Sequence, residues 1–164
     1  MPVVTRDTAE SVRTDEHAAF GISTTWGLAD AAGLTQFGAH YETLEPGAVS
    51  SLRHWHSAED EFLYMLEGEA VLYEGEERHV LTPGMAAGWP AGAEKGHFLR
   101  NESDADASYL IVGTRVPGDV VTYPAHDRVL HRGEPPRFTT LAGEDAEMGP
   151  YERVARGLGT VEGG

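Results

Sequence analysis

The sequence predicts an all-β fold, a double-sheet jelly-roll barrel with extensions at both ends. Three observations support this prediction. Short stretches of strand character follow one another at near-regular spacing, with turn signals between them. The 164 residues include 20 glycines and 9 prolines, which favour many tight turns. The pattern contains neither a helix-length repeat nor an alternation of strands with helices, which argues against an α/β fold.

The chain divides into three predicted segments. Residues 1–35 form an N-terminal arm, residues 36–116 form the barrel, and residues 117–164 form a C-terminal extension whose end is disordered. Within the arm, we expect a short helix over residues 7–12 with Asp7 as its cap. We also expect one helical turn over Leu28–Ala32, closed by Gly33.

The barrel strands are expected where aliphatic, aromatic and β-branched residues stand between turns. Proline followed by glycine, as at Pro46-Gly47 and Pro83-Gly84, provides the dihedral angles that such turns need. Beyond the barrel, Val120–Tyr123 could add a strand, and residues 124–141 are expected to wrap the outside. The expected barrel strands are Gln36–Leu44, Val49–His56, Glu61–Leu66, Ala70–Tyr73, Arg78–Leu81, Ala86–Trp89, His97–Arg100 and Ser108–Arg115.

Composition and charge narrow the range of functions. Cysteine is absent, so any metal must be held by nitrogen and oxygen ligands. The formal net charge of −15 disfavours binding to nucleic acid phosphates and to anionic membrane surfaces. No apolar run approaches the roughly 20 residues that a membrane span needs. Because the first residues lack the apolar core of a signal peptide, we expect a cytoplasmic protein.

Two histidines, His54 and His56, suggest a metal site. Positions i and i+2 of a strand point to the same face and lie roughly 6–7 Å apart, whereas on a helix they would point to different sides. Glu61 follows after a short polar connection, and His97 begins a later strand-like stretch. Neutral imidazole together with carboxylate suits a divalent first-row metal ion.

These stretches resemble the two sequence motifs of the cupin superfamily, in particular those of small single-domain cupins. Six residues separate Gly47 from His54 where five are usual, and four separate Gly92 from His97 where two are usual. Both additions fall in turns and leave the order and type of the ligands intact. The matching residues are Gly47, His54, His56, Glu61 and Gly68 in the first motif, and Gly84, Pro90, Gly92, His97 and Asn101 in the second.

The resemblance implies a double-stranded β-helix barrel over residues 36–116 with one metal ion per chain. The implied ligands are His54, His56, Glu61 and His97, and the implied ion is Fe, Mn, Ni, Cu or Zn. Such a site leaves one or two coordination positions for water or substrate. The reaction is not determined by the resemblance, because one fold hosts many chemistries.

Three functional hypotheses remain open at this stage. The first is a metal-dependent enzyme, of dioxygenase, isomerase or lyase type, acting on a small organic molecule that chelates through oxygen. The second is a non-catalytic module that binds or senses a small molecule. The third is a storage-like barrel, against which the small chain and the intact ligand set both argue.

Strand alternation proposes which residues share the barrel interior with the metal. Leu63 and Met65 should point inward with Glu61, and Leu99 should point inward with His97. Ordinary core packing explains these apolar residues equally well. The candidate substrate-binding residues are Leu63, Met65, Trp89, Lys95, Leu99, Tyr41 and Tyr109, with His40 also considered as an acid or base.

The same alternation turns Phe62, Tyr64 and Leu66 outward, which leaves this strand apolar on both faces. Either the N-terminal arm or a second subunit must then cover the outer face. We expect a homodimer with a small-molecule ligand.

Overall fold

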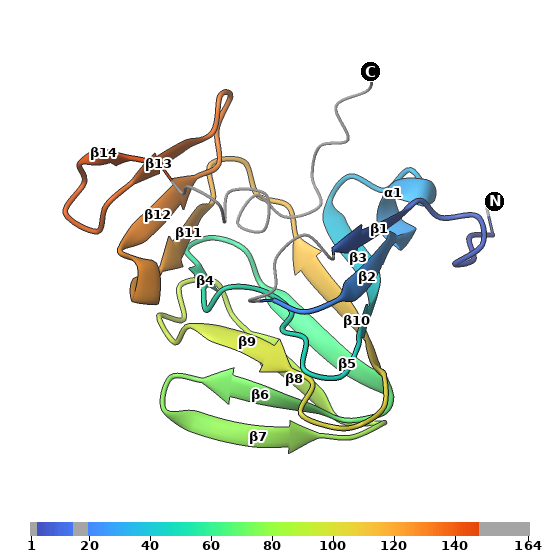
Figure 1. The fold of residues 1–164 in the computed structure, drawn as a ribbon. Coiled ribbons are helices and arrows are strands. Elements are labelled where there is room, and N and C mark those ends of the chain that lie inside the picture. Colours follow the sequence, from blue (N-terminus) through green and yellow to red (C-terminus); the bar gives the residue numbers. More distant parts are fainter. Residues whose placement is uncertain (1–2, 15–19, 148–164) are drawn as a thin grey trace.

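The computed structural model describes residues 3–14 and 20–147, and it confirms the predicted all-β fold (Figure 1). Short loops join antiparallel strands, and the only helices in these residues are one short α-helix and one 3-10 turn. None of these helices has the length and hydropathy needed to cross a bilayer. The elements are β1 (Ser11–Thr14), β2 (Ser23–Gly27), α1 (Leu28–Ala31), β3 (Phe37–Leu44), β4 (Trp55–His56), β5 (Glu61–Glu67), β6 (Ala70–Glu74), β7 (Glu77–Leu81), β8 (Ala86–Trp89), β9 (His97–Arg100), β10 (Ala107–Thr114), β11 (Val120–Tyr123), η1 (Pro124–His126), β12 (Arg128–His131), β13 (Arg137–Thr139) and β14 (Asp145–Ala146).

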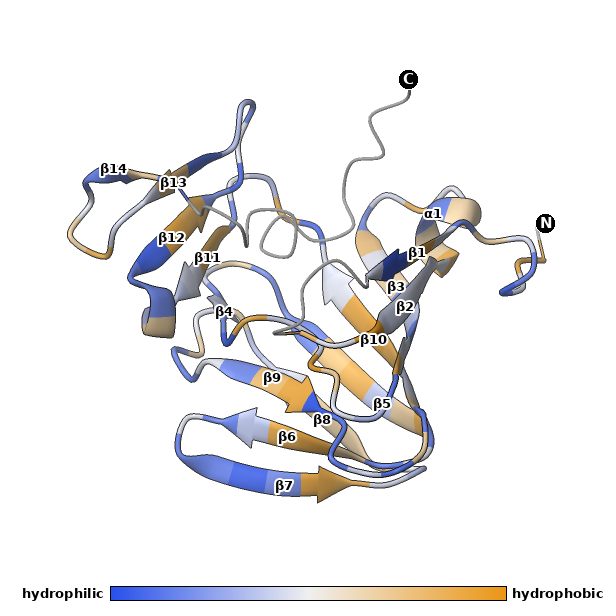
Figure 2. Ribbon diagram, in the orientation of Figure 1, coloured by the Kyte–Doolittle hydropathy of each residue, from blue (hydrophilic) through white to orange (hydrophobic). Residues whose placement is uncertain are grey.

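Two sheets form the walls of the barrel. One has six strands in the order β1-β2-β3-β10-β5-β8, and the other has three strands in the order β7-β6-β9. Figure 2 shows hydrophobic residues on both β5 and β9, and residues of these two strands belong to one buried cluster. The main core is built from both sheets and comprises Leu44, Ala48, Leu63, Met65, Ala70, Leu72, Leu81, Trp89, Leu99, Ala107 and Tyr109.

The turn after β5 depends on glycine for two reasons. Gly68 has a φ angle of +67°, which side chains with a Cβ rarely adopt. A Cβ placed there would also lie 2.2 Å from the carbonyl oxygen of Asp106. The close approach of β5 and the start of β10 therefore requires the glycine that the motif provides.

Strand β5 shows the expected alternation of inward and outward residues. Leu63 and Met65 are fully buried. Phe62, Tyr64 and Leu66 are exposed on the opposite face. This division places the side chain of Glu61 on the interior side of the sheet, together with the buried pair.

The predicted strand over residues 49–56 is interrupted, which corrects one expectation. Isolated bridges pair Val49 with Arg100 and His54 with His97, and only Trp55–His56 forms a regular strand. Between the two bridges, residues 49–54 contain two more residues than the segment that they face. The two extra residues form bends outside the ladder of hydrogen bonds, because two segments of unequal length cannot keep continuous pairing.

The arm and the extension also differ from the predictions. The expected helix over 7–12 is wrong, because Ser11–Thr14 forms strand β1, which pairs with β2 at the edge of the six-stranded sheet. The predicted turn of helix is confirmed as α1, with Gly33 at a φ angle of +73°. The expected disorder at the end of the chain falls on residues 148–164, outside the described residues.

The C-terminal extension forms a sheet instead of wrapping the outside. Strand β11 forms, as the sequence allowed, and the order of the sheet is β14-β13-β12-β11-β4. In Figure 1 this sheet stands beside the barrel and joins it through β4. A second hydrophobic cluster supports it, made of Phe20, Leu52, Val121, Tyr123, Leu130 and Phe138. The extension is therefore attached directly to the strand that contains His56.

Candidate metal centre

The residues of the predicted metal site lie close together at one end of the barrel interior. One candidate ligand atom each from His54, His56 and Glu61 lie within 4.8 Å of one another. His97 stands outside that group, but its Nε2 lies 2.7 Å from Oε2 of Glu61. Its ring centroid is 5.1 Å from that of His54, which it faces through the isolated bridge. The fold thus gathers three imidazoles and one carboxylate from three separate segments.

Neighbouring groups determine which nitrogen of two of these histidines is available. Nδ1 of His54 lies 2.8 Å from the carbonyl oxygen of Leu52, and a carbonyl can only accept a hydrogen bond. Nδ1 of His56 lies 2.8 Å from Oδ2 of Asp119. Both Nδ1 atoms therefore donate, which leaves Nε2 of each ring with a free lone pair.

The third imidazole is held by packing. Trp89 stacks on His97 with 3.8 Å between the ring centroids and 7° between the planes. The indole Nε1–H of Trp89 donates to Glu74 at 3.0 Å, which fixes the indole in turn. Nδ1 of His97 is buried and has no hydrogen-bond partner. The ring is therefore oriented by Trp89 and by Glu61.

The pKa values favour a set of groups ready to bind a cation. Burial, with smaller contributions from the neighbouring histidines, lowers the pKa of His54 to about 4, so this imidazole is neutral at neutral pH. Burial alone would raise the pKa of Glu61. The hydrogen bond from His97 and the nearby imidazoles outweigh that effect and lower it to about 2. Neutral imidazole beside ionised carboxylate is the donor set that divalent first-row metals bind.

A divalent metal ion fits this cluster. The donors are nitrogen and oxygen only, as a chain without cysteine requires. The Nε2 lone pairs of His54 and His56 are free for a ligand, and the Glu61 carboxylate lies within reach of both rings. A cation would also neutralise the charge of this buried carboxylate.

A second carboxyl group faces the barrel interior beside the cluster. The register pairs Glu42 of β3 with Tyr109 of β10, and Tyr109 with Met65 of β5, so all three share the inner face with Glu61. The Tyr109 hydroxyl donates to Oε2 of Glu42 at 2.5 Å. Burial, opposed by this bond and assisted by the charge of Glu61, raises the pKa of Glu42 to about 7. His40 lies on the same face, and burial lowers its pKa.

The candidate substrate-binding residues divide into two groups. Leu63, Met65, Leu99, Trp89 and Tyr109 are buried in the main core around the cluster. The other two lie elsewhere. Tyr41 lies on the outer face of the sheet, where its ring meets Trp26 at 5.7 Å, and exposed Lys95 forms ion pairs with Glu77 and Glu74.

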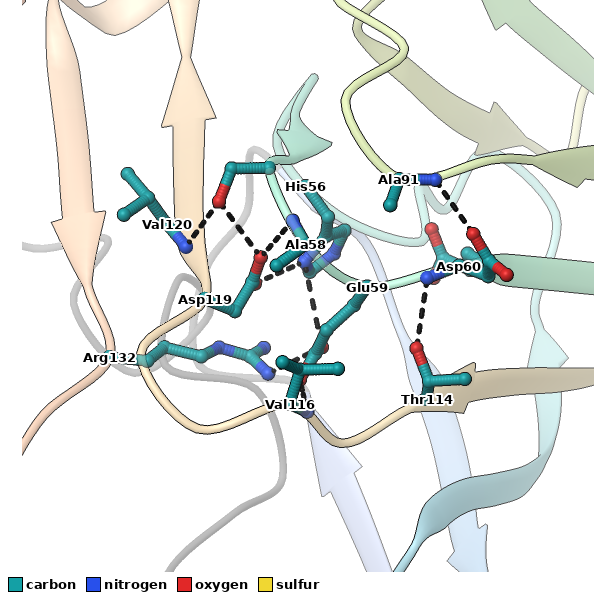
Figure 3. A network of polar contacts seen from close by, with 12 residues as sticks. His56, Ala58, Glu59, Asp60, Ala91, Thr114, Val116, Asp119, Val120 and Arg132 are labelled. Carbon is teal, nitrogen blue, oxygen red and sulfur yellow. Dashed lines mark hydrogen bonds and ion pairs between the residues drawn. The ribbon is translucent and has the colours of Figure 1, made fainter.

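Asp119 and Glu59 are site residues that the sequence reasoning did not find (Figure 3). Asp119 is fully buried and accepts a hydrogen bond from His56. Burial alone would raise its pKa, but the bonds from His56 and from the Ala58 amide lower it to about 2. Glu59 is paired with Arg132 at 2.9 Å. No motif surrounds Asp119, so no signal in the sequence points to it. Glu42 was also missed, but strand alternation from the buried Leu44 would have placed it on the inner face.

The fold and the site together define a class of protein, the small jelly-roll barrels that hold a His/Glu cluster at one end of the interior. The sequence profile of the family described as the Cupin domain matches residues 40–113. The chain belongs to the cupin superfamily. No curated protein matches the sequence significantly.

Solved structures extend the similarity beyond the barrel. A cupin described as a sugar phosphate isomerase, from Silicibacter pomeroyi, is 34% identical, with a TM-score of 0.81 over 93% of this chain and 99% of the other. A protein from Acidithiobacillus ferrooxidans, provisionally described as a sugar phosphate isomerase, is 29% identical, with a TM-score of 0.71 over 77% of this chain and 81% of the other. The polyketide cyclase RemF from Streptomyces resistomycificus shares the fold at 24% identity, with a TM-score of 0.56 over 70% of this chain and 79% of the other.

Proposed function

We propose that this protein is a metal-dependent isomerase that moves a proton between neighbouring carbons of a small hydroxy-carbonyl compound. His54, His56, Glu61 and His97 would hold one divalent ion, which is Fe, Mn, Ni, Cu or Zn. The observation that supports this reaction best is the carboxyl group of Glu42. It shares the inner face with Glu61. Its pKa of about 7 lies near neutral pH, where a group with such a pKa can both take up and return a proton.

The proposed mechanism assigns the proton transfer to the chain itself. A divalent ion held by these four residues would supply Lewis-acid polarisation of the substrate carbonyl group. Glu42 takes the proton from the carbon beside the carbonyl and returns it to the carbonyl carbon, while a proton moves between the two oxygens, so that no oxidant is needed. The Tyr109 hydroxyl holds the Glu42 carboxyl in place. Leu63, Met65 and Leu99 are buried in the main core beside the cluster and would keep water from the reacting atoms.

The similarity to the Silicibacter pomeroyi protein supports this reaction type, because that protein is described as a sugar phosphate isomerase. A phosphate group on the substrate is a separate question. Arg132, Arg115 and Lys95 each already pair with a carboxylate in this structure. We therefore propose a hydroxy-carbonyl substrate and include compounds both with and without a phosphate group in the test.

The first test is elemental analysis of protein purified without an affinity tag or added metal, beside a His54→Ala/His97→Ala double variant. We expect one equivalent of a transition metal in the wild type and little in the variant. Negligible metal in both proteins, persisting after reconstitution, would exclude the metal-dependent mechanism.

The second test detects the proton transfer directly. The metal-loaded protein is incubated in D₂O with a panel of aldoses, ketoses and their phosphates, and deuterium uptake at carbon is followed by NMR. We expect uptake with the wild type and a loss of at least about 100-fold in rate for Glu42→Gln, since general acid–base groups contribute about 10²–10⁴-fold. Oxygen consumption would indicate a dioxygenase, and depletion of a compound without change would indicate a binding or sensing protein.

We further propose that the protein is a homodimer that uses the outer face of β5. Phe62, Tyr64 and Leu66 are exposed there by 46%, 39% and 37%. Strands β1 and β2 of the arm extend the edge of the same sheet and do not cover this face. Light scattering on wild type and Phe62→Glu tests this, and a monomeric wild type would refute it.

The cytoplasmic location and the absence of nucleic acid or membrane binding remain predictions of the sequence.

A further inference from the structure

The buried carboxylate of Asp119 lies between the C-terminal sheet and the candidate metal centre. We propose that Asp119 is a positioning residue that fixes the tautomer and orientation of His56, and that the C-terminal sheet is thereby part of the metal site. This inference rests on the proposed metal site but concerns the role of Asp119, to which no motif of the sequence points. Figure 3 shows the contacts on which it depends.

The Asp119 carboxylate accepts hydrogen bonds from three consecutive residues, 56–58. Its Oδ2 lies 2.8 Å from Nδ1 of His56. Its Oδ1 accepts the Ala58 amide at 2.9 Å and the Ser57 hydroxyl at 3.3 Å. Because the side chain is fully buried, these donors replace water around the charge, and the histidine is the only ring among them.

The position of the carboxylate determines the state of the imidazole. An ionised carboxylate only accepts hydrogen bonds, so Nδ1 of His56 must bear the proton. Nε2 then keeps its lone pair for the cluster with His54 and Glu61. Without Asp119, the ring could rotate or take the other tautomer, and each metal-binding event would have to select the competent state.

His56, Glu59 and Asp119 could be interpreted as a second metal site, because each offers a ligand atom and these atoms lie within 4.8 Å of one another. Arg132 argues against that reading. Its Nη1 lies 2.9 Å from Oε2 of Glu59, so a cation already occupies the place of a metal. Oε1 of Glu59 accepts the Val116 amide at 2.9 Å. The carboxylates are therefore used as hydrogen-bond acceptors, and the cluster is a support for His56.

Backbone contacts extend this support to the start of the connection between the ligands His56 and Glu61. The amide of Ser57 donates to the carbonyl of Val120 at 2.9 Å, and the Val120 amide donates to the Ser57 hydroxyl at 2.9 Å. The Arg132 amide donates to the carbonyl of Asp119 at 3.0 Å. The C-terminal extension thus holds residues 57–59 through both backbone and side-chain contacts, whereas Asp60 is held by Thr114 of β10 and by Ala91.

Metal affinity tests the inference. The metal-free full-length protein is titrated with Zn²⁺ in competition with a chromophoric chelator. The variants are Asp119→Asn and the control Asp145→Asn, which makes the same change at a 94% exposed side chain of the same sheet. Loss of an outer-shell partner typically weakens metal binding about 10–100-fold, so we expect a loss of that size for Asp119→Asn only. Equal affinities for wild type and Asp119→Asn would overturn the proposal.

Nitrogen NMR of the metal-free wild type provides a readout that depends neither on metal binding nor on the folding of a variant. The ¹⁵N shifts of the His56 ring should show a protonated Nδ1 in the wild type and a tautomer mixture in Asp119→Asn. A wild type with Nε2 protonated would overturn the positioning role. A wild type with protonated Nδ1 but no affinity for Zn²⁺ would support the positioning of His56 while refuting the proposed metal site.

Discussion

The replacement of Glu42 by glutamine should change how the stability of the protein depends on pH. The folded protein raises the pKa of this carboxyl from 4.5 to about 7 because of burial, despite the hydrogen bond from Tyr109. An acid with a raised pKa binds more protons in the folded than in the unfolded state between these two values. Stability from this group is therefore fully present below pH 4.5 and is lost as the pH rises towards 7.

The size of the effect follows from linkage between protonation and folding. At about 1.4 kcal/mol for each pKa unit the full shift corresponds to a loss of about 3.5 kcal/mol, of which about 2.5 kcal/mol falls between about pH 5 and about pH 8. His54 acts in the opposite direction, because its lowered pKa of about 4 makes stability fall as the pH falls below 6.5. The wild-type curve alone therefore mixes both effects, and the difference between wild type and Glu42→Gln isolates Glu42.

The assay is urea unfolding of metal-free wild type, Glu42→Gln and Glu69→Gln at both pH values. Glu69 is exposed, so its replacement controls for the loss of one carboxylate. We expect Glu42→Gln to gain about 2.5 kcal/mol relative to wild type on going from about pH 5 to about pH 8, and Glu69→Gln to gain little. Parallel curves for wild type and Glu42→Gln would show that Glu42 titrates as an ordinary carboxyl, and its role in proton transfer would lose its physical basis.

Two further predictions concern the frame of the site. Trp89→Ala removes the ring that stacks on His97 at 3.8 Å and should weaken Zn²⁺ binding about 10-fold or more. Trp89→Phe can still stack on His97 and should bind Zn²⁺ within a few-fold of wild type. Chelator competition measures both affinities, and equal losses in the two variants would contradict the stacking argument. Gly68→Ala combines a φ of +67° with a 2.2 Å clash and should lose more than about 3 kcal/mol, whereas Gly47→Ala, at a φ of +83° in open space, should lose only about 1 kcal/mol. Thermal unfolding compares the two glycine variants, and similar melting temperatures would show that the contact with Asp106 relaxes without strain.

The sequence predicted well those features that depend on local geometry. Side chains of a strand alternate between faces whatever the partner strand is, so Leu63 and Met65 could be assigned to the interior and Phe62 to the outside. The turn glycines and prolines marked the ends of most strands for the same reason. The grouping of His54 with Glu61 was predicted from the resemblance to a family pattern, which encodes a tertiary arrangement already.

Irregular pairing was harder to predict. The two surplus residues between Val49 and His54 break the ladder, although Leu52, His54 and His56 alternate with Arg53 and Trp55 in the sequence. The residues that follow 7–12 lack a clean apolar stripe, and pairing with β2 decided the conformation of Ser11–Thr14. In both cases the partner strand overruled the local pattern.

The sequence by itself determined the fold class, the strand faces and the residue types of the candidate metal site. Only the tertiary structure decided which distant groups act on that site. Asp119 lies 63 positions from His56, and Tyr109 lies 67 positions from Glu42. The physical reason is that alternation and turn formation come from covalent geometry within a few residues, whereas hydrogen bonds between separate segments depend on how the sheets close. Burial in that closed barrel raises the pKa of Glu42, and no local stretch of sequence contains that information.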